Sequence, residues 1–171
     1  MTRFDEVKAS FWDQGDYGVQ PQLTEELVQE AQRLLGVLLP PSLLSVLCVQ
    51  NGGGVAARWR AFPTLAPTSW SQDHVPFGDL MGIGRRERMT SILDSPYLVE
   101  EWGLPTPVVL LSGDGHYWTA LDYRACGPQG EPSVTWFDTD EKSELALAAD
   151  FPSFIEGLTA TEGFDKGVQP V

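Results

Sequence analysis

Three short strand-like runs follow one another in the second half of the chain, and they constrain the fold more than any other feature. The first, Val108 to Leu111, is an unbroken apolar run of the kind found in strands covered on both faces. The second spans His116 to Tyr123, and the third, Ser133 to Asp138, alternates its side chains between two faces. The links between the runs are short, so the pattern predicts an antiparallel meander.

The link between the first two runs is Gly113-Asp114-Gly115. Glycine accepts positive φ angles at little cost, and an aspartate side chain can bond the backbone two residues on, so this cluster predicts a tight turn. An acid–base pair is the alternative, because Asp114 and Asp122 flank His116. We favour the turn, and replacement of His116 by alanine without loss of phenotype would count against catalysis.

Helical periodicity precedes the strands. A short amphipathic helix is predicted within Thr2 to Trp12. A second helix has Thr24 as its N-cap and Gly36 as its C-terminal cap. A third opens at Pro40-Pro41 and stops at Asn51, because proline is tolerated in a first turn and Asn-Gly ends helices.

The remaining segments give weaker signals. Val55 to Phe62 alternates imperfectly and predicts a strand, and Pro63 to Phe77 predicts short extended pieces. A helix is expected within Met89 to Trp102, interrupted at Pro96. A last helix should cover about Ala149 to Leu158 and bury its apolar face.

Helices at both ends with strands between them predict an α+β fold. The length of 171 residues suits one domain. We assign residues 1–158 to that domain and residues 159–171 to a flexible C-terminal tail, because the tail contains Gly and Pro and little periodic pattern.

The charge excludes some partners. The chain has 11 Lys and Arg against 24 Asp and Glu, a net charge of −13. Nucleic acids and anionic membranes require basic residues to neutralise phosphates, so neither is an expected partner. An acidic domain instead attracts basic protein surfaces and speeds encounter with them, although the same acidity could serve solubility alone.

The acidic stretch from Glu131 to Asp150 includes the third strand, and the part after this strand is predicted to be a loop that displays carboxylates. Against a basic surface these groups could take the place of nucleic-acid phosphates, and a merely solvated acidic loop is the alternative. The candidate partner-binding residues are Asp114, Asp122, Asp138, Asp140, Glu141 and Glu144.

No catalytic, metal-binding or cofactor-binding residue is predicted. The two cysteines and two histidines, Cys48, Cys126, His74 and His116, lack the close spacing of zinc ligands. We expect free thiols, with Cys48 packed in the core and Cys126 partly exposed in a loop. The basic cluster Arg85 to Arg88 is expected to be a solvated face or to pair with surrounding acids, and phosphate binding is the alternative.

The cellular location also follows from the sequence as an expectation. The chain lacks a run of roughly 18 apolar residues, which a membrane span requires. Its first residues lack the basic-then-apolar layout of a signal peptide. Two cysteines are too few for a disulfide scaffold. A cytoplasmic protein is therefore expected, as a monomer or a weak dimer.

The order of these parts resembles the SUKH superfamily, which includes the fungal Smi/Knr cell-wall regulators and many bacterial proteins. That pattern has an early Trp, two helices with characteristic ends, and a sheet with a Gly-Asp-Gly turn. The segments that carry the resemblance lie between Trp12 and Leu158, and they are Leu35-Gly36-Val37-Leu38-Leu39-Pro40, Gln50-Asn51-Gly52-Gly53, Gly113-Asp114-Gly115 and Leu121-Asp122-Tyr123.

The resemblance implies an α+β fold with a curved, mainly antiparallel sheet flanked by helices, and a non-enzymatic function. Many bacterial members are immunity proteins that bind a cognate toxin, often a nuclease or another nucleic-acid-modifying enzyme, and block it. The fungal members act as regulatory scaffolds, which is the alternative for this chain. One scaffold serves many partners, so the resemblance does not identify a particular toxin.

Overall fold

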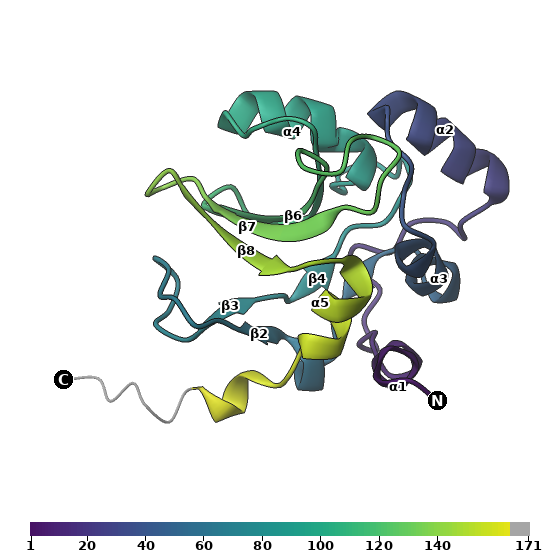
Figure 1. The fold of residues 1–171 in the computed structure, drawn as a ribbon. Coiled ribbons are helices and arrows are strands. Elements are labelled where there is room, and N and C mark those ends of the chain that lie inside the picture. The colour runs from purple at the N-terminus through teal and green to yellow at the C-terminus, as the bar shows by residue number, and fades with distance from the viewer. Residues whose placement is uncertain (165–171) are drawn as a thin grey trace.

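The computed structural model describes residues 1–164, and its fold is α+β as predicted (Figure 1). The helices are α1 (Arg3–Ala9), α2 (Glu25–Leu35), α3 (Pro41–Val49), α4 (Ser95–Trp102) and α5 (Phe151–Gly157). The strands are β1 (Gly53–Gly54), β2 (Ala61–Pro63), β3 (His74–Pro76), β4 (Asp79–Leu80), β5 (Val108–Gly113), β6 (Tyr117–Asp122), β7 (Ser133–Asp138) and β8 (Ser143–Ala148).

Helix α2 has the two ends that its sequence predicts. The Thr24 side chain accepts a hydrogen bond from the Leu27 amide at 3.2 Å, which satisfies one of the free donors of the first turn. Gly36 adopts a left-handed conformation at φ +71° and ends the helix. Local chemistry alone therefore sets the length of this element.

The predicted meander is confirmed as strands β5, β6 and β7, and it continues into β8. Residues 143–148 were expected to belong to an acidic loop, and that expectation is wrong. Their sequence, SELALA, is poor in β-branched and aromatic residues, so intrinsic propensity does not favour a strand. Pairing with β7 and packing of Leu145 and Leu147 against the core make it one.

The four-stranded sheet lies between two layers (Figure 1). Helix α4 lies on one side, whereas the β2–β3 hairpin and α5 lie on the other. Both faces of the central strands are consequently buried. The largest fully enclosed side chains include Trp136 of β7, Tyr123 after β6, and Phe151 and Phe154 of α5.

Two local expectations are wrong for reasons of packing. Residues 57–59 form a 3-10 turn in place of a strand, and this turn directs Trp59 into the core with 6% of its surface exposed. Pro96 does not interrupt a helix, because it lies in the first turn of α4, where no hydrogen bond from a backbone N–H is required.

Asn51 does more than end α3. Its buried side-chain amide donates to the carbonyls of Pro21 and Ile83, both at 2.8 Å, and accepts from the Ile83 amide at 2.9 Å. Gly82 passes so close that a Cβ there would lie 2.2 Å from the Asn51 carbonyl. Asn51 therefore holds two distant segments against the end of the helix.

The residues after α5 differ in part from the expected tail. Thr159 and Ala61 exchange backbone hydrogen bonds of 2.8 and 2.9 Å, and the ring of Phe164 stacks on His74 at 4.4 Å between centroids. Residues 159–164 are thus attached to the β2–β3 hairpin. The rest of the predicted tail, residues 165–171, lies outside the described residues.

The cysteines divide between a wrong and a correct prediction. Both are free thiols, and Cys126 is exposed as expected. Cys48 is exposed too, although core packing was predicted. Helix α3 is apolar nearly all round, so its periodicity does not reveal which face is buried; the core takes Leu43, Val46 and Leu47.

Candidate partner-binding surface

Three connections meet at one end of the four-stranded sheet. They are the β2–β3 loop (residues 64–73), the β5–β6 turn (114–116) and the β7–β8 turn (139–142). The Thr139 amide donates to the His116 carbonyl at 3.0 Å and joins the two turns. The Ser69 hydroxyl donates to the carboxylate of Asp138 and joins the loop to β7. We call these three segments the loop end.

The β5–β6 turn forms as the sequence predicts. One carboxylate oxygen of Asp114 accepts from the His116 amide at 2.9 Å, which closes the turn two residues on. Gly113 and Gly115 have φ angles of +156° and +103°. A Cβ at Gly115 would lie 2.7 Å from the indole of Trp102, so glycine is required there.

His116 links the two turns electrostatically. Its Nδ1 lies 3.1 and 3.2 Å from the two carboxylate oxygens of Asp140. This hydrogen bond, followed by the charges of Asp140 and Asp114, raises the pKa of His116 above its usual 6.5. All three side chains are exposed, so solvent screens the attraction, and carboxylates remain available at the surface.

Two of the six candidate carboxylates are inside the protein. Asp138 is 2% exposed and accepts from Ser69 and from the Glu141 amide. Burial raises its pKa, but these hydrogen bonds outweigh burial and leave the pKa below 3.8. Asp122 is 8% exposed, and its carboxylate accepts from Thr135. Both carboxylates are therefore buried and bonded within the protein, and neither is exposed to a partner that approaches the surface.

A third candidate, Glu144, lies at the surface but is already paired. The guanidinium of Arg124 contacts both Asp122, at 2.8 and 3.0 Å, and Glu144, at 3.1 Å. It also lies over the ring of Phe137, 5.5 Å from its centroid. These carboxylates raise the pKa of Arg124, so the pair of acids shares one permanent positive charge.

The structure brings Asp114, Asp140 and Glu141 together on the loop end as exposed carboxylates. Among residues 1–164, Lys and Arg form no ion pair with any of them. These three are the candidates best placed to face a partner.

Sequence reasoning missed a cleft beside them. It has a volume of about 650 Å³ and lies between the C-terminal end of α4 and the β7–β8 turn. Glu100, Glu101 and the half-exposed Trp102 line one wall, and Lys142 lines the other. One signal was present in the sequence: acidic residues in the last turn of a helix oppose its dipole, which suggests that they are retained for another reason.

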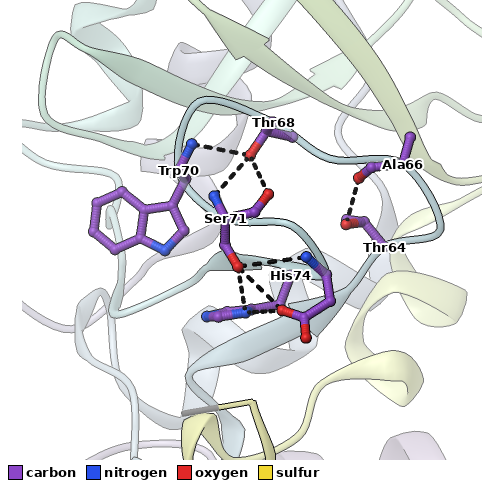
Figure 2. A network of polar contacts seen from close by, with 7 residues as sticks. Thr64, Ala66, Thr68, Trp70, Ser71 and His74 are labelled. Atoms are coloured by element: carbon purple, nitrogen blue, oxygen red, sulfur yellow. Dashed lines mark hydrogen bonds and ion pairs between the residues drawn. The ribbon is translucent and has the colours of Figure 1, made fainter. Parts of the chain in front are cut away.

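The β2–β3 loop contains three residue types that recur in hydrolases, but not their geometry. Asp73 lies 2.9 Å and the Ser71 hydroxyl 3.1 Å from the same ring nitrogen, Nδ1 of His74 (Figure 2). A catalytic triad places its acid and its nucleophile on opposite ring nitrogens. The arrangement therefore stabilises the loop and does not activate Ser71.

Within residues 1–164, no group of three or more His, Cys, Asp or Glu is placed to hold a metal ion.

Fold and surface together define an α+β domain whose sheet ends in acidic turns edged by exposed tryptophans. The chain matches the model of the SMI1 / KNR4 family (SUKH-1) over residues 22–157. The match covers most of the chain, so this protein belongs to that family, which includes toxin immunity proteins and fungal regulators. No curated protein matches the chain. In the described part of the chain, every helix is too short or too polar to cross a membrane.

Proposed function

We propose that this protein is an immunity protein that binds a cognate toxin and blocks it by occluding its active site. Members of the family are generally non-enzymatic immunity or regulatory proteins, which supports binding over catalysis. A nuclease or another nucleic-acid-modifying toxin suits the proposal, because such an enzyme presents a basic surface to its substrate.

The observation that carries the proposal is the convergence of Asp114, Asp140 and Glu141 at the loop end. The Thr139 amide joins the two turns by its hydrogen bond to the His116 carbonyl, and the His116 amide holds the Asp114 carboxylate, so these groups are positioned before a partner arrives. With a net charge of −13, the whole molecule attracts a basic toxin at long range. We infer that these carboxylates occupy positions that phosphates of the substrate would take.

We propose a cytoplasmic location, because an immunity protein has to bind its toxin in the compartment where the toxin would act. Cys48 and Cys126 are exposed free thiols, and a reducing compartment keeps such thiols reduced.

The test uses the gene next to the one that encodes this protein. If that gene encodes a large secreted protein, its C-terminal domain is the candidate toxin, and we would co-express this domain with the protein and measure growth. The variant Asp114→Lys, Asp140→Lys, Glu141→Lys should lose protection, and its association with the purified toxin domain at low salt should slow by about 10-fold or more. Added salt should slow association of the unaltered protein.

The control variant has the same change in net charge at a distance from the loop end. Glu87, Glu131 and Glu156 are exposed residues on other segments, and Glu131 lies in the connection at the opposite end of the sheet. Their replacement by lysine should leave most protection intact. An equal loss of protection in the two variants would show that the net charge of the protein, and not the position of these carboxylates, determines binding. Failure of the unaltered protein to protect would contradict immunity and favour the regulatory scaffold.

A further inference from the structure

The β2–β3 loop exposes two apolar side chains, and one of them, Trp70, lies against Tyr117 next to the β5–β6 turn. Leu65 is 108% exposed and the indole of Trp70 is 51% exposed. Contact with water is unfavourable for apolar side chains. Tryptophan is also strongly enriched among the residues that contribute most of the binding energy at protein interfaces. A loop that displays both without burying them is suited to burial by another molecule.

The loop is held in one conformation by its own hydrogen bonds (Figure 2). The Thr64 amide donates to the Asp73 carbonyl and the Thr68 amide to the Ser71 carbonyl, both at 2.8 Å. The Thr68 hydroxyl accepts from the Trp70 amide at 3.1 Å, and the indole lies to one side of this network. A partner therefore meets an ordered loop, and little conformational entropy is lost on binding.

An aromatic row supports Trp70 from beneath. Its ring meets Tyr117 edge to face at 5.6 Å, and Tyr117 stacks on Trp136 at 4.4 Å. Burial raises the pKa of Tyr117 to about 12, so its phenol stays neutral in this row. Ser69, the neighbour of Trp70, is bonded to Asp138 of β7. The indole is thus fixed on a sheet that extends to the core.

The surrounding charge decides what kind of molecule covers the loop. Asp73 lies within it, with 55% of its side chain exposed, and the exposed carboxylates Asp114 and Asp140 lie on the adjoining turns. A second copy of this chain would bring carboxylates against carboxylates. A basic protein surface would instead be attracted to the rim while the apolar side chains are buried.

We propose that Leu65 and Trp70 are the apolar anchors of the complex and are buried against a toxin surface rimmed by Lys and Arg. This inference rests on the proposed function and adds to it the source of affinity: the carboxylates accelerate encounter, whereas the anchors set the dissociation rate.

The first experiment measures the affinity of purified variants for the candidate toxin domain. Trp70→Ala should weaken binding by about 30-fold or more, mostly through faster dissociation. Leu65→Ser should weaken it by about 3-fold or more without affecting the fold, because Leu65 is fully exposed. Tyr97→Ala and Val49→Ser are the matched controls, since both side chains are exposed on other elements, and they should change the affinity by less than about 2-fold.

Normal affinity of Leu65→Ser and Trp70→Ala for a toxin domain that the unaltered protein binds would overturn the anchors and leave the proposed function standing. A loss caused by Asp114→Lys, Asp140→Lys, Glu141→Lys alone would point to charge as the sole determinant.

A second experiment does not depend on the toxin. A phage-displayed library of random peptides would be panned on the immobilised unaltered protein, and the selected peptides tested on each variant. Peptides that combine basic and apolar residues should be enriched, should bind Tyr97→Ala, and should lose binding to Trp70→Ala and Leu65→Ser. Selected peptides that bind the anchor variants normally would overturn the proposal, whatever the toxin measurement gives.

Discussion

The aspartates of the sheet divide into an interior pair and an exterior pair. Asp122 and Asp138 lie at the ends of β6 and β7 and are buried, whereas Asp114 lies in the β5–β6 turn and Asp140 in the β7–β8 turn, and both are exposed. The interior carboxylates have dedicated donors in Arg124, Ser69 and Thr135. The same residue type therefore stabilises the fold at one position and remains free to meet a partner a few residues away.

In the interior pair, hydrogen bonds compensate for the cost of burying a charged carboxylate. Burial disfavours the charged form of both interior aspartates, yet hydrogen bonds lower the pKa of each below 3.8. Each must remain ionised to satisfy its donors, so a change at either site should affect stability. Changes at the exterior pair should affect binding.

The largest effect on stability is expected for Arg124→Ala. This change leaves the carboxylate of Asp122, whose side chain is 10% exposed, without its guanidinium. An uncompensated buried charge should lower the free energy of unfolding by about 2–3 kcal/mol, measured by urea denaturation. Arg124→Lys, which retains the charge but not the two-pronged geometry, should lose less. An unchanged denaturation midpoint for the alanine variant would show that Asp122 does not depend on this partner.

A matched pair of variants compares the interior and the exterior directly. Asp138→Asn replaces a buried acceptor of two hydrogen bonds and should cost about 1–2 kcal/mol of unfolding free energy. Asp140→Asn alters an exposed residue and should change stability by less than about 0.5 kcal/mol. Equal losses in the two variants, measured in the same denaturant series, would contradict the division.

Part of the acid dependence of stability should come from the interior pair, in addition to the exposed Asp5 and Asp73, whose pKa values are also lowered. Because the folded pKa values of Asp122 and Asp138 lie below 3.8, their stabilisation is present above that pH and is lost as the pH falls through the lowered values. The unfolding free energy of the unaltered protein should therefore fall with acid below pH 3.8. Asp138→Asn should flatten this slope.

The smallest effect concerns His116. Its raised pKa means that its attraction to Asp140 is fully present below pH 6.5 and is lost as the pH rises through the folded value. An NMR titration of the imidazole should give a pKa above 6.5 that moves back toward 6.5 in Asp140→Asn. A titration identical in the two proteins would show that the link between the turns does not form in solution.

Elements with strong local chemistry were predictable. Helix α2 carries its own caps, and β5 to β7 carry apolar runs separated by turn residues. Strand β8 and the 3-10 turn at residues 57–59 were not, because their local patterns are weak and pairing or burial of Trp59 decides their conformation. Trp70 and Trp102 were missed as surface residues, since a tryptophan in sequence is first expected in the core.

The order of residues was sufficient to establish the α+β class, the Gly-Asp-Gly turn and the strong negative charge, because each depends on neighbours in the chain or on composition. Which carboxylates face outward was decided only when the chain folded. Ser69 bonds Asp138 across 69 positions and Arg124 bonds Glu144 across 20, so partners of these acids come from distant segments, although Arg124 itself follows Asp122 by two positions. Spacing in the sequence does not reveal such partners, and they separate the acids that stabilise the sheet from those we propose to face a toxin.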